Sequence, residues 1–177
     1  MAVSFTSPGI AVRPATSADI PILGRFGALL VSLHHELDPD RFIGPTPNTE
    51  SAYAEFLSQQ LKRPDVIVLV AEGAGAVLGY TYAGLEGTDY MALRGPAGVV
   101  YDLVVDPTRR REGIGRSLLE ATLSELAARG APRIVLSTAE RNEAAQRLFN
   151  SLGFRRTMVE MTRELSEFKP AQNGLHE

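Results

Sequence analysis

The residue types best suited to chemistry are concentrated in residues 101–119, where an apolar run meets several arginines and two glycines. Arg110, Gly113 and Gly115 form the pattern R-x-x-G-x-G, and apolar residues at helical spacing follow it. A glycine turn that leads into a helix directs free backbone N–H groups, and the positive end of the helix dipole, at one spot. Glycine also leaves bare backbone against which a phosphate can lie. The stretch therefore predicts an anion-binding loop, and the nearby arginines favour a phosphate.

This loop differs from two well-known phosphate loops. The P-loop requires a Lys-Ser or Lys-Thr pair after its last glycine, and no such pair follows Gly113 or Gly115. The dinucleotide fingerprint G-x-G-x-x-G requires a third glycine where Leu118 stands. Both loop types are excluded, and at this point an ordinary strand-to-helix turn with a basic surface remains the alternative to an anion site.

Two carboxyl groups near this loop are candidates for proton transfer. Asp102 interrupts an otherwise apolar run, and Glu86 ends the apolar run before it. A buried carboxylate needs hydrogen-bond partners or a raised pKa, so Asp102 is either a general base or a carboxylate held by structural partners. Tyr82, Tyr90 and Tyr101 are the candidate proton donors, with a place in the core or in a pocket wall as the alternative for each.

The composition excludes several kinds of site. The chain has no cysteine, which excludes disulfides, thiolate metal ligands and a cysteine nucleophile. Its net charge of −3 argues against general nucleic-acid binding. His34 and His35 diverge by about 100° on a helix and make a poor metal pair, so we expect no metal. Without a membrane-length apolar run or a signal peptide, we expect a cytoplasmic protein with no membrane partner.

The pattern of apolar residues predicts one α/β domain over residues 10–165, between a flexible N-terminus at 1–9 and a polar tail at 166–177. The first hairpin must be antiparallel, while the strand–helix–strand unit around Gly113 should be a parallel crossover. The predicted strands are 10–13, 66–71, 77–85, 99–105, 132–136 and 156–165, and the predicted helices begin near residues 18, 49, 114 and 143.

A second motif lies farther along the chain. Residues 142–154, NEAAQRLFNSLGF, are similar to the N-x-x-A-x-x-L-Y-x-x-x-G-F segment of the GNAT superfamily of acyl-CoA N-acyltransferases. The R-x-x-G-x-G pattern resembles the pyrophosphate loop of the same family, and the two motifs stand in the family's order and separation. The resemblance covers residues 10–165 in element order and is specific from 101 to 154. It implies a single-domain GNAT-like fold, with a mixed sheet of about six or seven strands flanked by about four helices.

The resemblance also implies how the chain would bind acetyl-CoA. Backbone groups of residues 103–105 would pair with the pantetheine arm like an added strand, and backbone N–H groups of residues 111–116 would hold the pyrophosphate. The Asn142 side chain would bond pantetheine or phosphate oxygens, and it can cap a helix at the same time. The predicted coenzyme-binding residues are Leu103, Val104, Val105, Arg110, Arg111, Glu112, Gly113, Ile114, Gly115, Arg116, Asn142 and Phe149.

The implied reaction is the direct transfer of an acetyl group from acetyl-CoA to a primary amine in a ternary complex. In this family the central strand splays from its neighbour, the thioester lies in the gap, and here a backbone N–H near Val104 or Val105 would stabilise the oxyanion. Acidic residues such as Asp89 suit a small cationic acceptor, although a peptide amine is equally compatible with the fold, and a homodimer is allowed. The predicted catalytic residues are Asp102, Glu86 and Tyr101. Asp102 would act as a base directly or through water, or it would hold the amine.

The chain departs from the family pattern at two places. Phe149 stands where the family usually has a tyrosine that protonates the leaving thiolate, and phenylalanine has no proton to donate. Another hydroxyl or a water would have to act, or the thiolate leaves unaided. A non-catalytic acyl-CoA-binding regulator is therefore the alternative function, and a phosphate binder unrelated to CoA is a third. Only residues 155–165 follow the last motif, which predicts a short or absent final hairpin.

Overall fold

The structure is a computed structural model that describes residues 9–165 of the 177-residue chain. Residues 1–8 and the predicted polar tail at 166–177 lie outside the described residues. None of the described helices is both long and apolar enough to cross a bilayer. In chain order the elements are β1 (Ile10–Pro14), η1 (Ser17–Asp19), α1 (Ile20–Leu37), α2 (Thr49–Gln60), β2 (Val66–Gly73), β3 (Ala76–Glu86), β4 (Ala97–Val105), η2 (Pro107–Arg109), α3 (Ile114–Ala128), β5 (Ile134–Leu136) and α4 (Glu143–Ser151).

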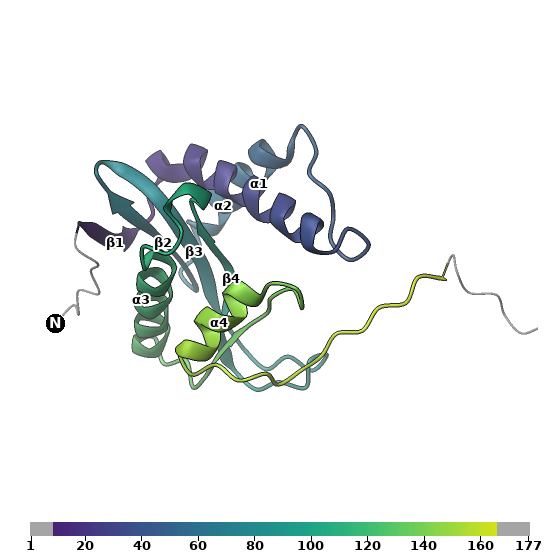
Figure 1. Cartoon of the computed structure of the whole chain (residues 1–177). Coiled ribbons are helices and arrows are strands. Elements are labelled where there is room, and N and C mark those ends of the chain that lie inside the picture. The colour runs from purple at the N-terminus through teal and green to yellow at the C-terminus, as the bar shows by residue number, and fades with distance from the viewer. Residues whose placement is uncertain (1–8, 166–177) are drawn as a thin grey trace, which may run out of the picture.

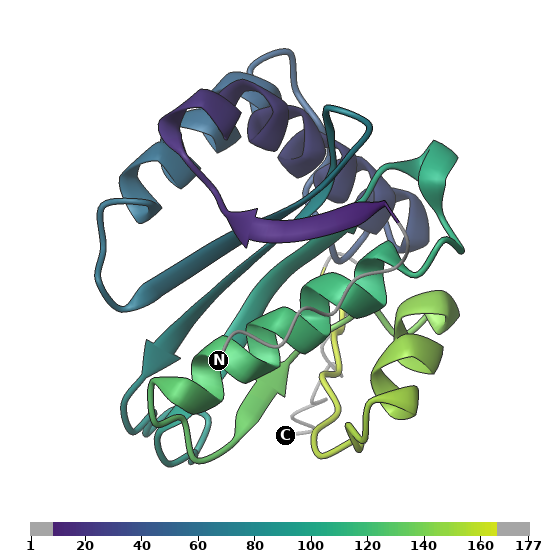
Figure 2. The same cartoon turned by 90° about the vertical axis from the view of Figure 1, so that its left-hand side faces the viewer.

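The strands form one mixed sheet in the order β1-β2-β3-β4-β5. Neighbours from β1 to β4 are antiparallel, whereas β4 and β5 are parallel and joined through α3, as predicted. Helices α1 and α2 lie on one face of the sheet, and α3 crosses the other face with α4 beside it (Figures 1 and 2). The α/β class and the four helices are therefore confirmed.

The predicted strand count is wrong, because the described sheet has five strands. The prediction of a final strand at 156–165 rested on alternating apolar residues in that segment. Residues 154–164 form no regular element, and the apolar side chains of Met158, Val159 and Met161 are exposed. The segment runs away from the sheet in Figure 1, and Glu160 is ion-paired with Arg41 of the α1–α2 loop. Alternation alone cannot make a strand when no neighbouring strand supplies hydrogen bonds.

Two apolar clusters fill the spaces between the sheet and its helices. On the α3 side, leucines of α3 pack on β2, β3 and β4, and Phe149 of α4 is buried at the edge of the same cluster. On the α1 side, Leu23, Phe26 and Leu57 pack against Tyr80, Tyr82 and Val104 of the sheet. The central strands β3 and β4 are thus covered on both faces, which fixes the position of β4 within the molecule.

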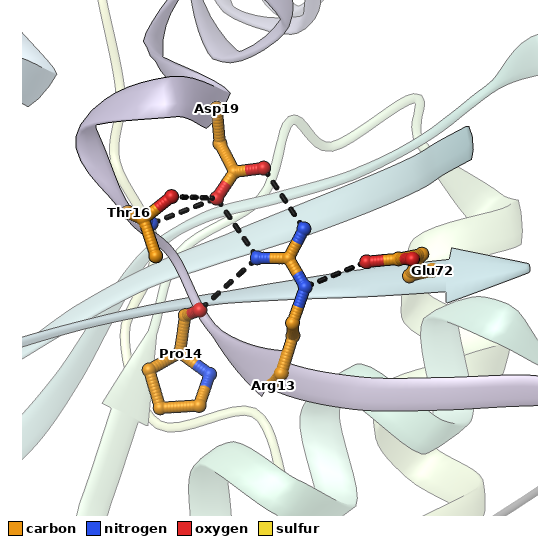
Figure 3. A network of polar contacts seen from close by, with 5 residues as sticks. All are labelled: Arg13, Pro14, Thr16, Asp19 and Glu72. Carbon is orange, nitrogen blue, oxygen red and sulfur yellow. Dashed lines mark hydrogen bonds and ion pairs between the residues drawn. The ribbon is translucent and has the colours of Figure 1, made fainter. Parts of the chain in front are cut away.

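A charged network fastens the start of α1 to the sheet edge (Figure 3). The Arg13 guanidinium of β1 donates to both oxygens of Asp19, at 2.8 and 3.0 Å, and to Glu72 of β2 at 2.6 Å. Asp19 also accepts the backbone N–H of Thr16 at 2.7 Å, as in a capping box. These bonds lower the pKa of the nearly buried Asp19 carboxyl to about 2, the Arg13 hydrogen bonds being the largest cause. The network therefore holds the β1–α1 turn most firmly while Asp19 is ionised.

Candidate active site

The central strand β4 separates from β5 part-way along its length. The parallel pairing joins Gly98, Val99 and Val100 to residues 134–136 and stops there. Residues 102–105 pair with β3 on one side, and among the described residues the other backbone edge of residues 101–105 has no strand partner. This is the splay that the family resemblance implies, and it leaves a strand edge that an extended ligand can pair with.

A β-bulge at Tyr101 lies at the point of separation. Tyr82 pairs with Asp102, and the next residue of β3, Ala83, pairs with Val100, so Tyr101 is the extra residue. A bulge reverses the side-chain alternation of a strand. As a result Val100 belongs to the α3-side cluster, whereas Asp102 lies on the opposite face with Tyr80 and Val104.

The loop before α3 has the backbone of an anion-binding turn. Arg111 and Gly113 both have positive φ, at 69° and 81°, and Gly113 is the N-cap of α3. A positive φ costs a non-glycine residue about 1–2 kcal/mol, and such strain marks candidate functional sites. Within residues 9–165 the backbone N–H groups of residues 111–116 have no hydrogen-bond acceptor, and the first intrahelical bond runs from Ser117 to Gly113. The loop therefore presents a run of free donors at a helix N-terminus.

The arginines around this loop differ in their partners. Arg109 is ion-paired with Glu112 at 2.7 Å, and Arg116 donates to Ser151 of α4 at 2.7 Å. The guanidinium groups of Arg110 and Arg111 have no hydrogen-bond or ion-pair partner in the described part of the chain, and both residues are exposed. Two free cations thus accompany the free N–H groups, which suits a doubly charged anion such as a pyrophosphate.

The two glycines of the loop have different roles. Gly113 has the left-handed backbone that favours glycine. A Cβ on Gly115 would face Val105 and Leu148 at an ordinary 3.5 Å, so the missing side chain of Gly115 lies toward the protein. We expected both glycines to expose the backbone to a phosphate. The backbone geometry supports this expectation only at Gly113.

The second motif supplies a capped helix beside the loop. The Asn142 side chain accepts the backbone N–H of Ala145 at 3.2 Å, so it is an N-cap as predicted. Phe149 is buried, with its ring 6.0 Å from that of Phe154. The helix thus presents no hydroxyl at position 149, and the coenzyme contacts predicted for Asn142 and Phe149 stay predictions.

Asp102 is held in a buried network of three side chains. Its Oδ2 accepts the hydroxyl of Tyr53 of α2 at 2.7 Å and that of Tyr80 of β3 at 2.8 Å. The residue is only 7% exposed, and burial raises the pKa of its carboxyl against the opposing effect of the two phenols. Its Oδ1 has no hydrogen-bond donor among residues 9–165. Asp102 is therefore a fixed, buried carboxyl with one oxygen unused.

Glu86 and Tyr101 form a separate cluster where β3 leaves the sheet. The Tyr101 hydroxyl donates to Glu86 at 2.6 Å, and its ring lies 4.6 Å from the ring of Tyr82. The other oxygen of Glu86 is ion-paired with Arg94, which is also 3.8 Å from Asp89. The structure thus brings Glu86 and Tyr101 together and leaves Asp102 in a different network.

Sequence analysis did not single out the residues that complete these two networks. Tyr53 and Tyr80 come from elements remote in sequence from Asp102, and Arg94 lies in the irregular 86–96 stretch. The available sequence signal was the position of Tyr53 on the apolar face of α2. A tyrosine in that position suits a core residue as well as a residue of a functional site. Tyr90, a predicted proton-donor candidate, is 83% exposed at the tip of the β3–β4 loop.

Comparison with known proteins identifies the family. The model of the acetyltransferase (GNAT) family matches residues 30–154, which include the splayed strand, the loop and α4. The chain belongs to this family. The resemblance found in its two motifs is thereby confirmed.

Curated relatives match the chain over part of their length. A mycothiol acetyltransferase of Thermobispora bispora is 42% identical over 96 residues, which are 52% of this chain and 31% of the relative. A [ribosomal protein bS18]-alanine N-acetyltransferase of Escherichia coli is 38% identical over 60 residues, 34% of this chain and 40% of that one. The chain thus spans between 20% and 37% of the length of four mycothiol acetyltransferases that it matches.

Solved structures match nearly the whole chain. The BH1408 protein of Bacillus halodurans has a TM-score of 0.74 at 28% identity, covering 87% of this chain and 98% of the other. A predicted acetyltransferase of Clostridium acetobutylicum, solved with acetyl-CoA, has a TM-score of 0.69 at 17% identity, covering 90% of this chain and 98% of the other. The BH1408 structure extends the similarity beyond the two sequence motifs. At 17% identity, the Clostridium structure supports the fold alone.

Proposed function

We propose that this protein transfers an acetyl group from acetyl-CoA to a primary amine. The observation that carries the proposal is the conjunction of two features at one end of β4: an unpaired backbone edge over residues 101–105, and a loop of free N–H groups before α3. An extended thioester arm attached to a pyrophosphate matches both features at once. A simple phosphate binder would need the loop and not the splayed strand.

The coenzyme's position in the proposal follows from these two features. The pyrophosphate binds the N–H groups of residues 111–116, with Arg110 and Arg111 adding charge, and the pantetheine arm pairs with the open edge of β4. The thioester then lies near the bulge at Tyr101, where the strands separate. A backbone N–H of β4 polarises the thioester carbonyl and stabilises the oxyanion. No metal is needed for this chemistry.

Asp102 receives the acceptor's ammonium group in this proposal. The carboxylate is buried, hydrogen-bonded by two neutral phenols, and without a cationic ion-pair partner among residues 9–165. A buried charge without a counter-ion is costly, and the ammonium of an amine supplies one at the free Oδ1. Tyr53 and Tyr80 keep the carboxyl in one orientation while the amine loses its proton and attacks.

The acceptor is defined here only as a primary amine. Glu86 and Asp89, which the sequence offered as acidic pocket residues, are engaged with Arg94, so they support a strongly cationic acceptor less than expected. The relatives named for mycothiol and for a ribosomal-protein alanine share residues with this chain. Their names differ in the acceptor, so the shared segment fits the common coenzyme better than a common acceptor. A cytoplasmic location and a homodimer stay predictions.

The test is release of CoA thiol from acetyl-CoA with a panel of amines. The panel contains a peptide with a free N-terminal alanine, spermidine, an aminoglycoside and a free amino acid. We expect acetylation of at least one amine, with kcat/KM reduced about 100-fold or more in Asp102→Asn, because the buried counter-ion is lost. Full activity of Asp102→Asn would remove the role assigned to Asp102.

The second candidate function is a non-catalytic acyl-CoA-binding regulator. Phe149 favours it, because the family's usual hydroxyl is missing at the leaving group. A CoA thiolate with a pKa of about 8–9 leaves without help in the transferase proposal. Tight acetyl-CoA binding without turnover of any amine in the panel would favour the regulator.

A further inference from the structure

His34 of α1 continues the face of the helix that packs on the sheet. Leu23, Phe26 and Leu30 of α1 contact the cluster that contains Tyr80 and Val104. His34 follows Leu30 by four residues, which places it one turn farther along the same face. The residue is half-buried, so the imidazole lies between the apolar cluster and solvent.

The hydrogen bonding of His34 fixes which ring nitrogen is free. Its Nδ1 lies 2.9 Å from the backbone oxygen of Leu30. A carbonyl oxygen only accepts, so Nδ1 carries the hydrogen and, in the neutral ring, Nε2 carries the lone pair. Nε2 has no hydrogen-bond partner among the described residues. The edge of the Phe42 ring, at 4.9 Å between centroids, packs on the imidazole and limits its movement.

His34 is electrostatically linked to the Asp102 network. A positive charge on its imidazole lowers the pKa of the Asp102 carboxyl. The other titratable or charged groups gathered here are Tyr53 of α2, Tyr80 of β3, Asp38 at the end of α1, and Arg41, which lies over the Phe42 ring and is ion-paired with Glu160. Among these carboxylates Asp102 is the buried one, and its pKa responds to the charge of His34, so its negative charge attracts a positive charge on the imidazole.

We propose that His34 is the general base of the reaction, with Nε2 removing a proton from the ammonium that Asp102 binds. This inference rests on the proposed acetyl transfer and deepens it. The oriented ring has a free lone pair at Nε2, and the negative charge of Asp102 attracts the positive charge that proton transfer places on His34. Transfer occurs directly or through one water.

Acetyl transfer removes two protons from the ammonium nitrogen. The ammonium gives one proton to Nε2 of His34, and the neutral amine attacks the thioester carbon. As the new C–N bond forms and the C–S bond breaks, the electron pair of that bond passes to sulfur. The second proton leaves the nitrogen and is taken up by the thiolate, giving the amide and CoA thiol. His34 then returns its proton to solvent.

The test compares His34→Asn with His35→Asn. In His34→Asn the side-chain amide keeps a donor for the Leu30 oxygen and removes Nε2. His35 is the matched control, because its Nδ1 also lies 2.9 Å from a backbone oxygen, that of Phe42, on a different side of the helix. The measurement is kcat/KM for the best amine of the panel, from about pH 6 to about pH 10, together with the acetyl-CoA Kd of each variant.

We expect His34→Asn to lose about 100-fold in kcat/KM at neutral pH with its acetyl-CoA Kd unchanged, while His35→Asn stays close to the wild type. Activity of His34→Asn should recover above the pKa of the amine, where the acceptor is neutral without a base. A wild-type rate and pH profile in His34→Asn would overturn the proposal, and so would a loss that persists at high pH.

A second measurement begins with the wild type, so its first readout does not depend on the folding of any variant. Nitrogen NMR of the histidine rings in the wild type should show neutral His34 protonated at Nδ1, and the His34 signals should shift in Asp102→Asn more than those of His35. The Nε2-protonated form would overturn the proposal. A wild type that binds no acetyl-CoA or turns over no amine contradicts the proposed function itself, and His34 loses its role with it. A catalytically normal His34→Asn contradicts only the present inference.

Discussion

Gly113 and Gly115 belong to one sequence motif, but they differ in backbone conformation and in whether the structure requires glycine. Gly113 holds a positive φ that lets the loop turn its N–H groups outward, whereas a Cβ on Gly115 would meet Val105 and Leu148 at an ordinary 3.5 Å, so packing does not require glycine there. Both glycines belong to the same sequence pattern, and only the backbone geometry separates them. The pattern predicts the loop, and it does not predict which glycine matters to a ligand.

Alanine substitution should separate the two glycines. Gly113→Ala must adopt a left-handed backbone at a cost of about 1–2 kcal/mol, so we expect about a tenfold weaker acetyl-CoA Kd. Gly115→Ala has room for its methyl group and gains helix propensity, so it should be up to about 1 kcal/mol more stable and bind almost as the wild type does. Calorimetry and urea unfolding check the pair. Equal acetyl-CoA affinities in Gly113→Ala and Gly115→Ala would contradict the conclusion that only Gly113 needs to be glycine for binding.

At the scale of elements, the contact between α1 and α2 determines where Asp102 finds its partner. A Cβ on Gly27 would lie 2.0 Å from the Tyr53 ring, and one on Gly24 would lie 2.7 Å from the Glu50 backbone oxygen. The two glycines therefore allow α2 to approach α1 closely. This approach brings the Tyr53 hydroxyl to Asp102 of β4, on the face of the sheet that α1 and α2 cover.

Gly27→Ala should break this arrangement. The methyl group forces the Tyr53 ring to move, and overpacking of this kind costs about 1–3 kcal/mol against a gain of about 1 kcal/mol in helix propensity. We expect a net loss of up to about 2 kcal/mol in the free energy of unfolding, measured with urea, and a loss of kcat/KM similar to that of Tyr53→Phe. Tyr53→Phe is the control that removes only the hydroxyl. A Gly27→Ala protein as stable and active as the wild type would show that the contact is not needed.

The sequence predicts elements better than it predicts their partners. Strand, loop and helix from residue 99 to residue 128 could be predicted because local signals of apolar runs, proline and glycine all agree there. The strand predicted at 156–165 failed because strand formation needs a neighbour that local patterning does not reveal. The bonds of Asp102 to Tyr53 and Tyr80 join residues 49 and 22 positions apart, and they depend on a bulge and on helix packing.

At the scale of the whole molecule, stability against acid depends on the network at the β1–α1 turn. Asp19 has a folded-state pKa of about 2, below its ordinary value of 3.8, so its ionised form stabilises the fold. This stabilisation is fully present above about pH 4 and is lost as the pH falls toward 2. The lowered pKa of Asp19 corresponds to about 2 kcal/mol in the free energy of unfolding at neutral pH.

Asp19→Asn should therefore be less stable than the wild type by about 2 kcal/mol at pH 7, with the difference shrinking between about pH 4 and pH 2. Urea unfolding at several pH values measures it. Asp65→Asn is the control, because its ion pair with Arg63 is solvent-exposed and its loss should change the stability little at any pH. A pH-independent difference for Asp19→Asn would contradict the assigned role of the charge.

The central claim is that one end of β4 binds an acyl-CoA, and titration calorimetry of the protein with acetyl-CoA tests it most directly. ATP and NAD serve as competitors that share the phosphates without the thioester arm. We expect a Kd for acetyl-CoA of about micromolar order, a weaker Kd in Gly113→Ala, and much weaker binding of both competitors. No binding of acetyl-CoA, or ATP bound equally well, would contradict it.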